Sequence, residues 1–210
     1  MRTLAILPVK RFELAKTRLG EQLQPRERRT LAQAMVSDVL DALLASEWLE
    51  AVVVVTNETT VSELAHARGA RVLTDAAEAG QSAAALIGVA HALAEGYERV
   101  LLVPGDCPAL NTAALRTLLE RPMRAPAVTI VSDRAGSGTN ALLLVPPDAI
   151  EPGFGPDSFA RHRDRTEQAR ADWHSEPLPQ LLLDIDTPED LALLRSAHAG
   201  PATAVVLAEL

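Results

Sequence analysis

The stretch Arg99-Val100-Leu101-Leu102-Val103-Pro104-Gly105-Asp106-Cys107-Pro108-Ala109-Leu110 decides the fold that we expect for this chain. Its apolar run predicts a strand buried on both faces, as in a sheet covered by helices. The strand must end at Pro104, because proline cannot donate to a strand ladder, and Gly105 permits a tight turn. Asp106 then stands at the carboxyl end of the strand, where open α/β sheets bind ligands. The alternative is that Asp106 only shapes the turn or caps the helix expected near Asn111.

The composition is that of one folded domain. With 210 residues, 48% of them hydrophobic and 23% charged, the chain can bury one core, so we expect a single domain over residues 1–210. No apolar run reaches the ~20 residues of a membrane span, and the first residues lack the layout of a signal peptide. The single cysteine, Cys107, excludes an internal disulfide and suits packing better than nucleophilic attack. These features predict a cytoplasmic protein with no membrane partner.

Positive charge is scarce and concentrated. The net charge of −8 argues against a general nucleic-acid surface but leaves room for an anionic small substrate bound by local positive charge. The only two lysines, Lys10 and Lys16, share one segment with Arg11 and Arg18, directly after the first expected strand. Loops at this position often bind phosphates. The segment has no glycine-rich fingerprint, so it is neither a Walker loop nor a dinucleotide motif. The alternative is a solvated basic loop.

Strand and helix patterns alternate along the chain. We expect strands at 4–9, 51–56, 71–74, 100–103, 127–131, 140–145 and 180–185. We expect helices at 25–46, 60–68, 81–95, 112–120, 158–170 and 189–197. The predicted fold class is therefore α/β, with a mostly parallel sheet flanked by helices and an antiparallel hairpin at 127–145. The apolar tail at 201–210 packs either on the body or on a second subunit, which leaves a homodimer open.

A second carboxylate turn follows the strand expected at 180–185. It carries Asp184 and Asp186, which would reach the same sheet edge as Asp106 if both strands belong to one sheet. Mg²⁺ is typically held by one or two carboxylates together with substrate phosphates. The competing interpretation is a helix start capped by Thr187, which leaves Asp186 able to serve both purposes.

Two glycine-containing segments could bind an anion. In the first, Gly136–Asn140, backbone N–H groups and the Thr139 hydroxyl are the candidate donors. In the second, Gly153–His162, we expect Ser158 to cap a helix whose N-terminus could bind an anion. Each segment alone is explained as well by an ordinary turn, and we expect His162 to be solvated on its charged helix.

Together these segments resemble a known family, the guanylyltransferases of coenzyme F-420 biosynthesis, which act on 2-phospho-L-lactate or phosphoenolpyruvate. The resemblance covers nearly the whole chain, in the segments 7–19, 103–108, 138–142, 154–162 and 184–191. The two aspartate–proline turns occur in many nucleotidyltransferases. The lysine-bearing loop and the segment from Gly155 to His162 are the more specific signals.

The resemblance implies a glycosyltransferase-A-like nucleotidyltransferase fold, Rossmann-like in its strand–helix alternation, with Mg²⁺ as cofactor. It implies that Asp106 and Asp186 hold the metal, with Asp184 as the alternative in the second turn. It implies that Lys10 and Lys16 face the triphosphate of GTP, with Arg18 in the same loop. The implied ligands of the phosphorylated acceptor are Thr139, Gly155 and Ser158, with Gly138 beside them.

The implied reaction moves GMP from GTP to a phosphorylated three-carbon acid, for which phosphoenolpyruvate is favoured over 2-phospho-L-lactate. The chain departs from the family at Gly80-Gln81-Ser82, where Gly-Leu-Asn is more usual, and Gly80 and Gln81 are the candidate base-side residues. Two other functions stay open. One is a different nucleotidyltransferase, of the molybdopterin-cofactor or sugar-acid cytidylyltransferase type. The other is a non-catalytic nucleotide-binding module.

Overall fold

The computed structural model describes residues 1–12, 17–196 and 199–210. Its strands are β1 (Thr3–Val9), β2 (Ala51–Thr56), β3 (Arg71–Thr74), β4 (Arg99–Leu102), β5 (Ala127–Ser132), β6 (Thr139–Val145) and β7 (Asp172–Ser175). Its α-helices are α1 (Pro25–Leu44), α2 (Thr59–Ala67), α3 (Gln81–Ala94), α4 (Thr112–Glu120), α5 (Ser158–Gln168), α6 (Pro188–Ser196) and α7 (Pro201–Glu209). Two 3-10 helices, η2 (Thr17–Glu21) and η3 (Pro179–Leu181), complete the described elements.

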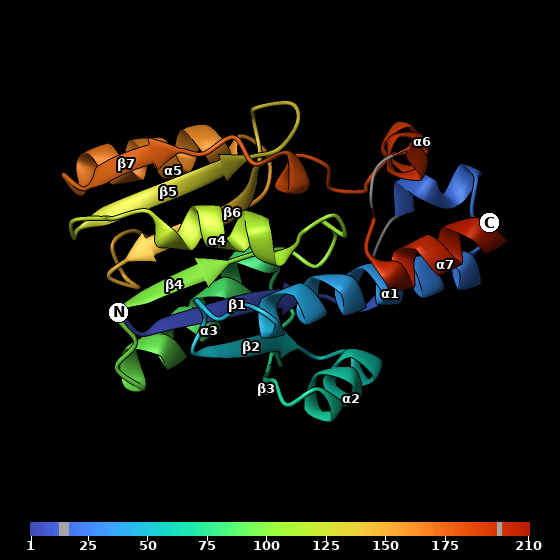
Figure 1. Ribbon diagram of the computed structural model, residues 1–210, viewed down its shortest axis with the longest axis horizontal. Coiled ribbons are helices and arrows are strands. Elements are labelled where there is room, and N and C mark those ends of the chain that lie inside the picture. Colours follow the sequence, from blue (N-terminus) through green and yellow to red (C-terminus); the bar gives the residue numbers. More distant parts are fainter. Residues whose placement is uncertain (13–16, 197–198) are drawn as a thin grey trace.

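The strands form one seven-stranded mixed sheet in the order β3-β2-β1-β4-β6-β5-β7. The first four strands are mutually parallel, β6 is antiparallel to both β4 and β5, and β7 is parallel to β5. The expected class, mostly parallel with an antiparallel hairpin, is confirmed. Because β6 runs against β4, its first residues lie at the edge where β1 to β4 end (Figure 1). The sheet therefore gathers chain segments from both halves of the molecule at one edge.

Helices cover both faces of the sheet, which explains why its strands are continuous apolar runs. Along β1 the side chains alternate between two cores: Ala5, Leu7 and Val9 pack toward α1, and Leu4 and Ile6 toward α3. Helices α4 and α7 extend the first core, while Phe159 of α5 packs against the second. No helix within the described ranges is long and apolar enough to cross a membrane.

The prediction of a strand at 180–185 is wrong. The chain there forms the short helix η3 and then an irregular segment, and the seventh strand of the sheet is β7, which the sequence did not indicate. Leu181 and Ile185 are buried, at 1% and 0% exposure, in the core on the α1 face. The apolar run thus reflects burial of its side chains against that core and not strand pairing.

The C-terminal residues pack on the body of the same chain, where α7 lies along α1 (Figure 1). The contact is anchored by the buried carboxylate of Asp38, which accepts hydrogen bonds from the N–H groups of Ala202 (2.9 Å) and Thr203 (2.8 Å). A carboxylate at this position accepts hydrogen bonds from N–H groups of the first helical turn, and its negative charge interacts favourably with the positive end of the helix dipole.

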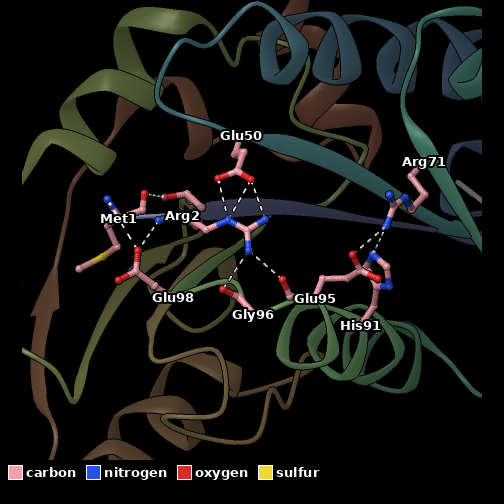
Figure 2. A network of polar contacts seen from close by, with 9 residues as sticks. Met1, Arg2, Glu50, Arg71, His91, Glu95, Gly96 and Glu98 are labelled. Atoms are coloured by element: carbon pink, nitrogen blue, oxygen red, sulfur yellow. Dashed lines mark hydrogen bonds and ion pairs between the residues drawn. The ribbon is translucent and has the colours of Figure 1, made fainter.

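Arg2 ties together several segments at the opposite edge of the sheet, where β1 begins. Figure 2 shows its guanidinium between the carboxylate of Glu50, at 2.7 Å, and the carbonyl oxygens of Glu95 and Gly96, at 2.8 and 3.2 Å. The two carbonyls directly follow α3, at the end where a cation is favoured by the helix dipole. Its hydrogen bond to Arg2 lowers the pKa of Glu50.

Candidate active site

A cleft of about 460 Å³ opens at the edge of the sheet where β1 to β4 end and β6 begins. The volume is typical of sites that bind small molecules. Every sequence-predicted site residue that the structure describes lines this cleft, namely Lys10, Arg18, Gly80, Gln81, Asp106, Gly138, Thr139, Gly155, Ser158, Asp184 and Asp186. Lys16 lies outside the described residues. The fold thus brings together residues that are up to 176 positions apart, from Lys10 to Asp186.

The Asp106 turn is packed tightly against the body. A Cβ on Gly105 would lie 2.8 Å from Cγ2 of Val36, so a larger residue would push the turn away from α1. Cys107 is fully buried in the core, in agreement with the packing role expected for it. Helix α4 is capped by Asn111, whose side chain accepts from the N–H of Ala114 at 2.9 Å. The helix cap is therefore not made by Asp106, which instead lines the cleft.

The second carboxylate turn meets the first through a backbone hydrogen bond. The N–H of Ile185 donates to the carbonyl oxygen of Asp106 at 3.2 Å, which sets the two turns side by side although 180–185 is not a strand. The start of α6 is capped by a reciprocal pair: the N–H of Thr187 donates to Asp190 at 2.9 Å, and the N–H of Asp190 donates to the Thr187 hydroxyl at 3.3 Å. As expected, the cap uses Thr187, and the N–H of Asp186 also donates to Asp190 at 3.3 Å.

Asp184 is held by Asn140, whose amide donates to Asp184 at 3.1 Å and to the carbonyl of Leu181 at 2.7 Å. Burial, and then the negative charge of Asp106 with a smaller effect from Asp186, raises the pKa of Asp184. These carboxylates are thus close enough to repel one another, and a cation would relieve the repulsion. Among the described residues, no three His, Cys, Asp or Glu side chains form a complete ligand set for a metal. The oxygen donors fit a hard cation such as Mg²⁺ that also binds substrate phosphates.

Positive charge enters the cleft from the loop after β1. Lys10 and Arg18 are both exposed residues of its lining, whereas Arg11 pairs with Glu78 at 2.6 Å. The loop is attached to the body where the N–H of Phe12 donates to the buried carboxylate of Glu58 at 3.1 Å. Two cationic side chains therefore line the same cleft as the carboxylates.

The cleft ends on one side at the carboxyl ends of β2 and β3 and at the start of α3. Gly80, with φ of 103°, precedes α3 and provides no side-chain cap, so the first N–H groups of this helix can receive an anion or a polar ligand. Two further lining residues, Asn57 and the buried Asp75, were missed from the sequence. Each follows a strand directly, which is the same signal that identified Asp106.

The other side of the cleft is formed by β6 and the start of α5. Ser158 is buried at 1% exposure and is the first helical residue, so the expectation that it caps α5 is wrong. The preceding position is taken by Asp157 in the left-handed conformation, with φ of 57° and no side-chain cap. Gly155 also has a positive φ, of 104°, which favours glycine at that turn. The N-terminus of α5 thus faces the cleft without a side-chain cap.

His162 is not solvated, contrary to the sequence-based expectation. Its exposure is 0%, and its two ring nitrogens contact two segments on this side of the cleft: Nδ1 lies 3.0 Å from the Thr139 hydroxyl, and Nε2 accepts from the N–H of Gly153 at 2.8 Å. Burial, with the charges of Arg165 and Arg161, lowers the pKa of His162 to about 4. The imidazole is therefore neutral near pH 7.

Comparisons with known proteins agree with this geometry. The model of a family described as "Guanylyl transferase CofC like" matches residues 3–200. A phosphoenolpyruvate guanylyltransferase from Conexibacter woesei is 48% identical over 201 residues, which cover 95% of this chain and 90% of that protein.

Solved structures share the fold at low sequence identity. A protein of Desulfovibrio desulfuricans G20 assigned to the nucleotide-diphospho-sugar transferases superposes with a TM-score of 0.77 at 20% identity, covering 100% of this chain and 95% of that one. A glucosyl-3-phosphoglycerate synthase from Mycobacterium tuberculosis, solved with Mg²⁺ and uridine diphosphate, has a TM-score of 0.56 at 14% identity and covers 84% of this chain and 69% of that one. At these identities the likeness establishes the fold alone.

Proposed function

This chain belongs to the CofC-like guanylyl transferase family, and on that premise we propose that it transfers GMP from GTP to the phosphate of phosphoenolpyruvate in coenzyme F-420 biosynthesis. The observation that carries the proposal is the cleft in which basic residues, converging carboxylates and the N-terminus of α3, which has no side-chain cap, meet. A nucleoside triphosphate and a phosphorylated acid are both polyanions. Positive groups along the cleft would offset the charge of both substrates.

The order of the strands suggests how the substrates lie. Asn57 and Asp75 follow β2 and β3, Lys10 and Asp106 follow β1 and β4, and Thr139 begins β6. We assign the base to the part of the cleft beside β2 and β3, the phosphates to the part beside β1 and β4, and the acceptor to the part beside β6. Guanine presents two adjacent donors, N1–H and the 2-amino group, to which a carboxylate is complementary. Asp75 is the buried carboxylate at that end, and its Oδ1 already accepts from the N–H of Glu78 at 3.1 Å.

Asp106 with Asp184 or Asp186 would hold Mg²⁺, with the remaining ligands supplied by phosphates and water. When bound by these residues, the metal would supply charge stabilisation to the reacting phosphate. Lys10 and Lys16, with Arg18 of η2, would bind the β- and γ-phosphates through charge. Asn140 positions Asp184 and thereby the second carboxylate turn.

The reaction needs little proton transfer. An oxygen of the acceptor phosphate attacks the α-phosphorus of GTP, a new P–O bond forms, and the bond to the β-phosphate oxygen breaks with its electron pair leaving on pyrophosphate. Because the acceptor phosphate is already ionised near neutral pH, no general base is required. The protein then acts mainly by holding the acceptor in line and stabilising charge. The site is in keeping with this, since its one buried imidazole, among the described residues, is committed to internal hydrogen bonds.

The test is pyrophosphate release with GTP and Mg²⁺ against phosphoenolpyruvate, 2-phospho-L-lactate and 3-phosphoglycerate. We expect turnover with phosphoenolpyruvate and its loss, by about 10²-fold or more, in Asp106→Asn. Asp148→Asn, an exposed aspartate in the turn beyond the far end of β6, is the matched control and should keep full activity. Turnover with CTP in preference to GTP would identify a different nucleotidyltransferase. Nucleotide binding without pyrophosphate release for any acceptor would identify a non-catalytic module.

A further inference from the structure

The buried imidazole of His162 links two segments that line the acceptor side of the cleft. Its ring packs edge-on against Phe154, with centroids 5.3 Å apart and an interplanar angle of 73°. One ring nitrogen faces Thr139 at the start of β6, and the other faces Gly153 in the loop before α5. One side chain therefore sets the relative position of both segments.

The hydrogen bond from Gly153 decides which tautomer is present. A backbone N–H can only donate, so Nε2 must present its lone pair to it. A neutral imidazole carries one hydrogen, which must then reside on Nδ1. Nδ1–H consequently donates to Oγ1 of Thr139, and not the reverse.

This donation determines what the Thr139 hydroxyl can do. A hydroxyl has one hydrogen, and it cannot be given to a nitrogen that is itself a donor. Within the described residues, Oγ1 of Thr139 has no other hydrogen-bond partner, and Thr139 lines the cleft. Its hydrogen is therefore available to an acceptor oxygen in the cleft.

We propose that His162 is a positioning residue that acts through Thr139: its Nδ1–H tautomer makes the Thr139 hydroxyl an obligatory donor to an anionic oxygen of the acceptor substrate. This inference rests on the proposed function for the identity of that substrate. The same imidazole holds Gly153, whose carbonyl oxygen accepts from Arg161 at 2.7 Å. The next residue, Phe154, fixes the loop to the start of α3, because its N–H donates to the Ser82 hydroxyl at 2.9 Å. Gly155, on the same loop, is thus held in place together with Thr139.

The first test is independent of catalysis. Two-bond ¹H–¹⁵N NMR spectra of the histidine-labelled protein distinguish Nδ1–H from Nε2–H imidazoles, and His162→Asn assigns the signal of His162 among the five histidines. We expect the Nδ1–H tautomer, although free imidazole side chains in water favour Nε2–H. An Nε2–H signal for His162 would overturn the proposal whatever the substrate of the enzyme is.

The second test separates the substrates. Thr139→Val should raise KM for phosphoenolpyruvate about tenfold or more and change KM for GTP by less than about twofold. The reason is that the substitution removes a hydrogen bond to a charged group of phosphoenolpyruvate and none to GTP. Thr139→Ser, which keeps the hydroxyl, should restore most of the affinity. Adding His162→Asn to Thr139→Val should cause a smaller loss than His162→Asn causes in the wild type, since the part of its effect that acts through Thr139 is already removed. Additive losses, or equal rises in both KM values, would contradict the proposal. Absence of GMP transfer by the wild type would instead overturn the proposed function and leave the NMR test standing.

Discussion

The N–H of Ile185 donates to the carbonyl oxygen of Asp106 at 3.2 Å, and this single backbone contact joins two turns that are nearly 80 residues apart in sequence. It sets Asp184 and Asp186 beside Asp106 without any strand pairing between the two segments. The carboxylates are close enough for the charge of Asp106 to raise the pKa of Asp184. The predicted metal site therefore depends on main-chain geometry as much as on the acidic side chains.

The first prediction concerns metal binding. Mg²⁺ together with GTP should raise the melting temperature of the wild type, since a ligand at about 100 times its Kd stabilises the folded state by about 2.7 kcal/mol. Asp106→Asn should abolish most of this increase, because it removes one of the charges that attract the metal. Differential scanning calorimetry with and without EDTA measures the effect, with Asp148→Asn as the control. An unchanged increase in Asp106→Asn would remove Asp106 from the metal site.

The second prediction concerns Asn140, which the sequence did not single out. Asn140→Leu should lower the free energy of unfolding by about 1–3 kcal/mol, because the carbonyl of Leu181 and the carboxylate of Asp184 lose a buried donor. It should also weaken Mg²⁺ binding, since Asp184 is no longer held. Urea denaturation and metal titration measure the two effects, and Gln168→Leu, at an exposed position, is the control. Normal metal affinity in Asn140→Leu would show that Asp184 is not a ligand.

The third prediction tests recognition of the base. The wild type should use GTP about ten- to a hundredfold better than ITP, which lacks the 2-amino group. Asp75→Asn should remove most of this preference, while its retained oxygen still accepts from the N–H of Glu78. The ratio of kcat/KM values for the two nucleotides is the measurement. Glu63→Gln, on the exposed face of α2, should leave the ratio unchanged, and an unchanged ratio in Asp75→Asn would place the base elsewhere.

The fourth prediction follows from the burial of His162. Its pKa is lowered to about 4 in the folded protein from a reference value of 6.5, so the unfolded state binds more protons between these values. The contribution of His162 is fully present above about pH 6.5 and is lost as the pH falls toward 4. Between pH 7 and pH 5 the wild type should lose about 2 kcal/mol more unfolding free energy than His162→Asn. Parallel stability curves for the two proteins would contradict the lowered pKa.

The fifth prediction concerns the network around Arg2, at the edge of the sheet opposite the cleft (Figure 2). Arg2→Ala should lower the melting temperature, because it removes contacts to Glu50 and to the carbonyls of Glu95 and Gly96 just after α3, and should leave kcat and both KM values unchanged. The pKa of Glu50 is lowered in the folded state. Its contribution is therefore present above the ordinary pKa of a glutamate and is lost as the pH falls below it. Arg163→Ala, whose partners are neighbours on α5, is the control.

Local pattern was sufficient for most elements of the fold. The apolar run before Pro104 and the β-branched run of β2 could be assigned because strands buried on both faces leave a clear compositional signal. The strand β7 left no such signal. Three of its four residues are exposed, including Asp172 and Trp173, and it lies at the end of the sheet, where one side of the strand pairs with no other strand in the part of the chain that the structure describes. For Leu181 to Ile185 the error was the opposite one, since a strand was predicted where none forms. Burial of apolar side chains does not reveal whether the backbone pairs with a strand.

The sequence was enough to identify the class of fold and the residue types of the site. Polar residues directly after buried strands can be recognised in the local sequence, and the carboxyl ends of parallel strands lie at one edge of the sheet. Only the tertiary structure decided that Ile185 and Asp106 pair, that Asn140 holds Asp184, and that α7 packs on α1. The role of His162 was also decided there, since its neighbours Thr139 and Gly153 are brought to it by the packing of α5 on the sheet. Long-range contacts of this kind depend on which distant segments the fold brings together, and the pattern of residues along one segment does not determine this.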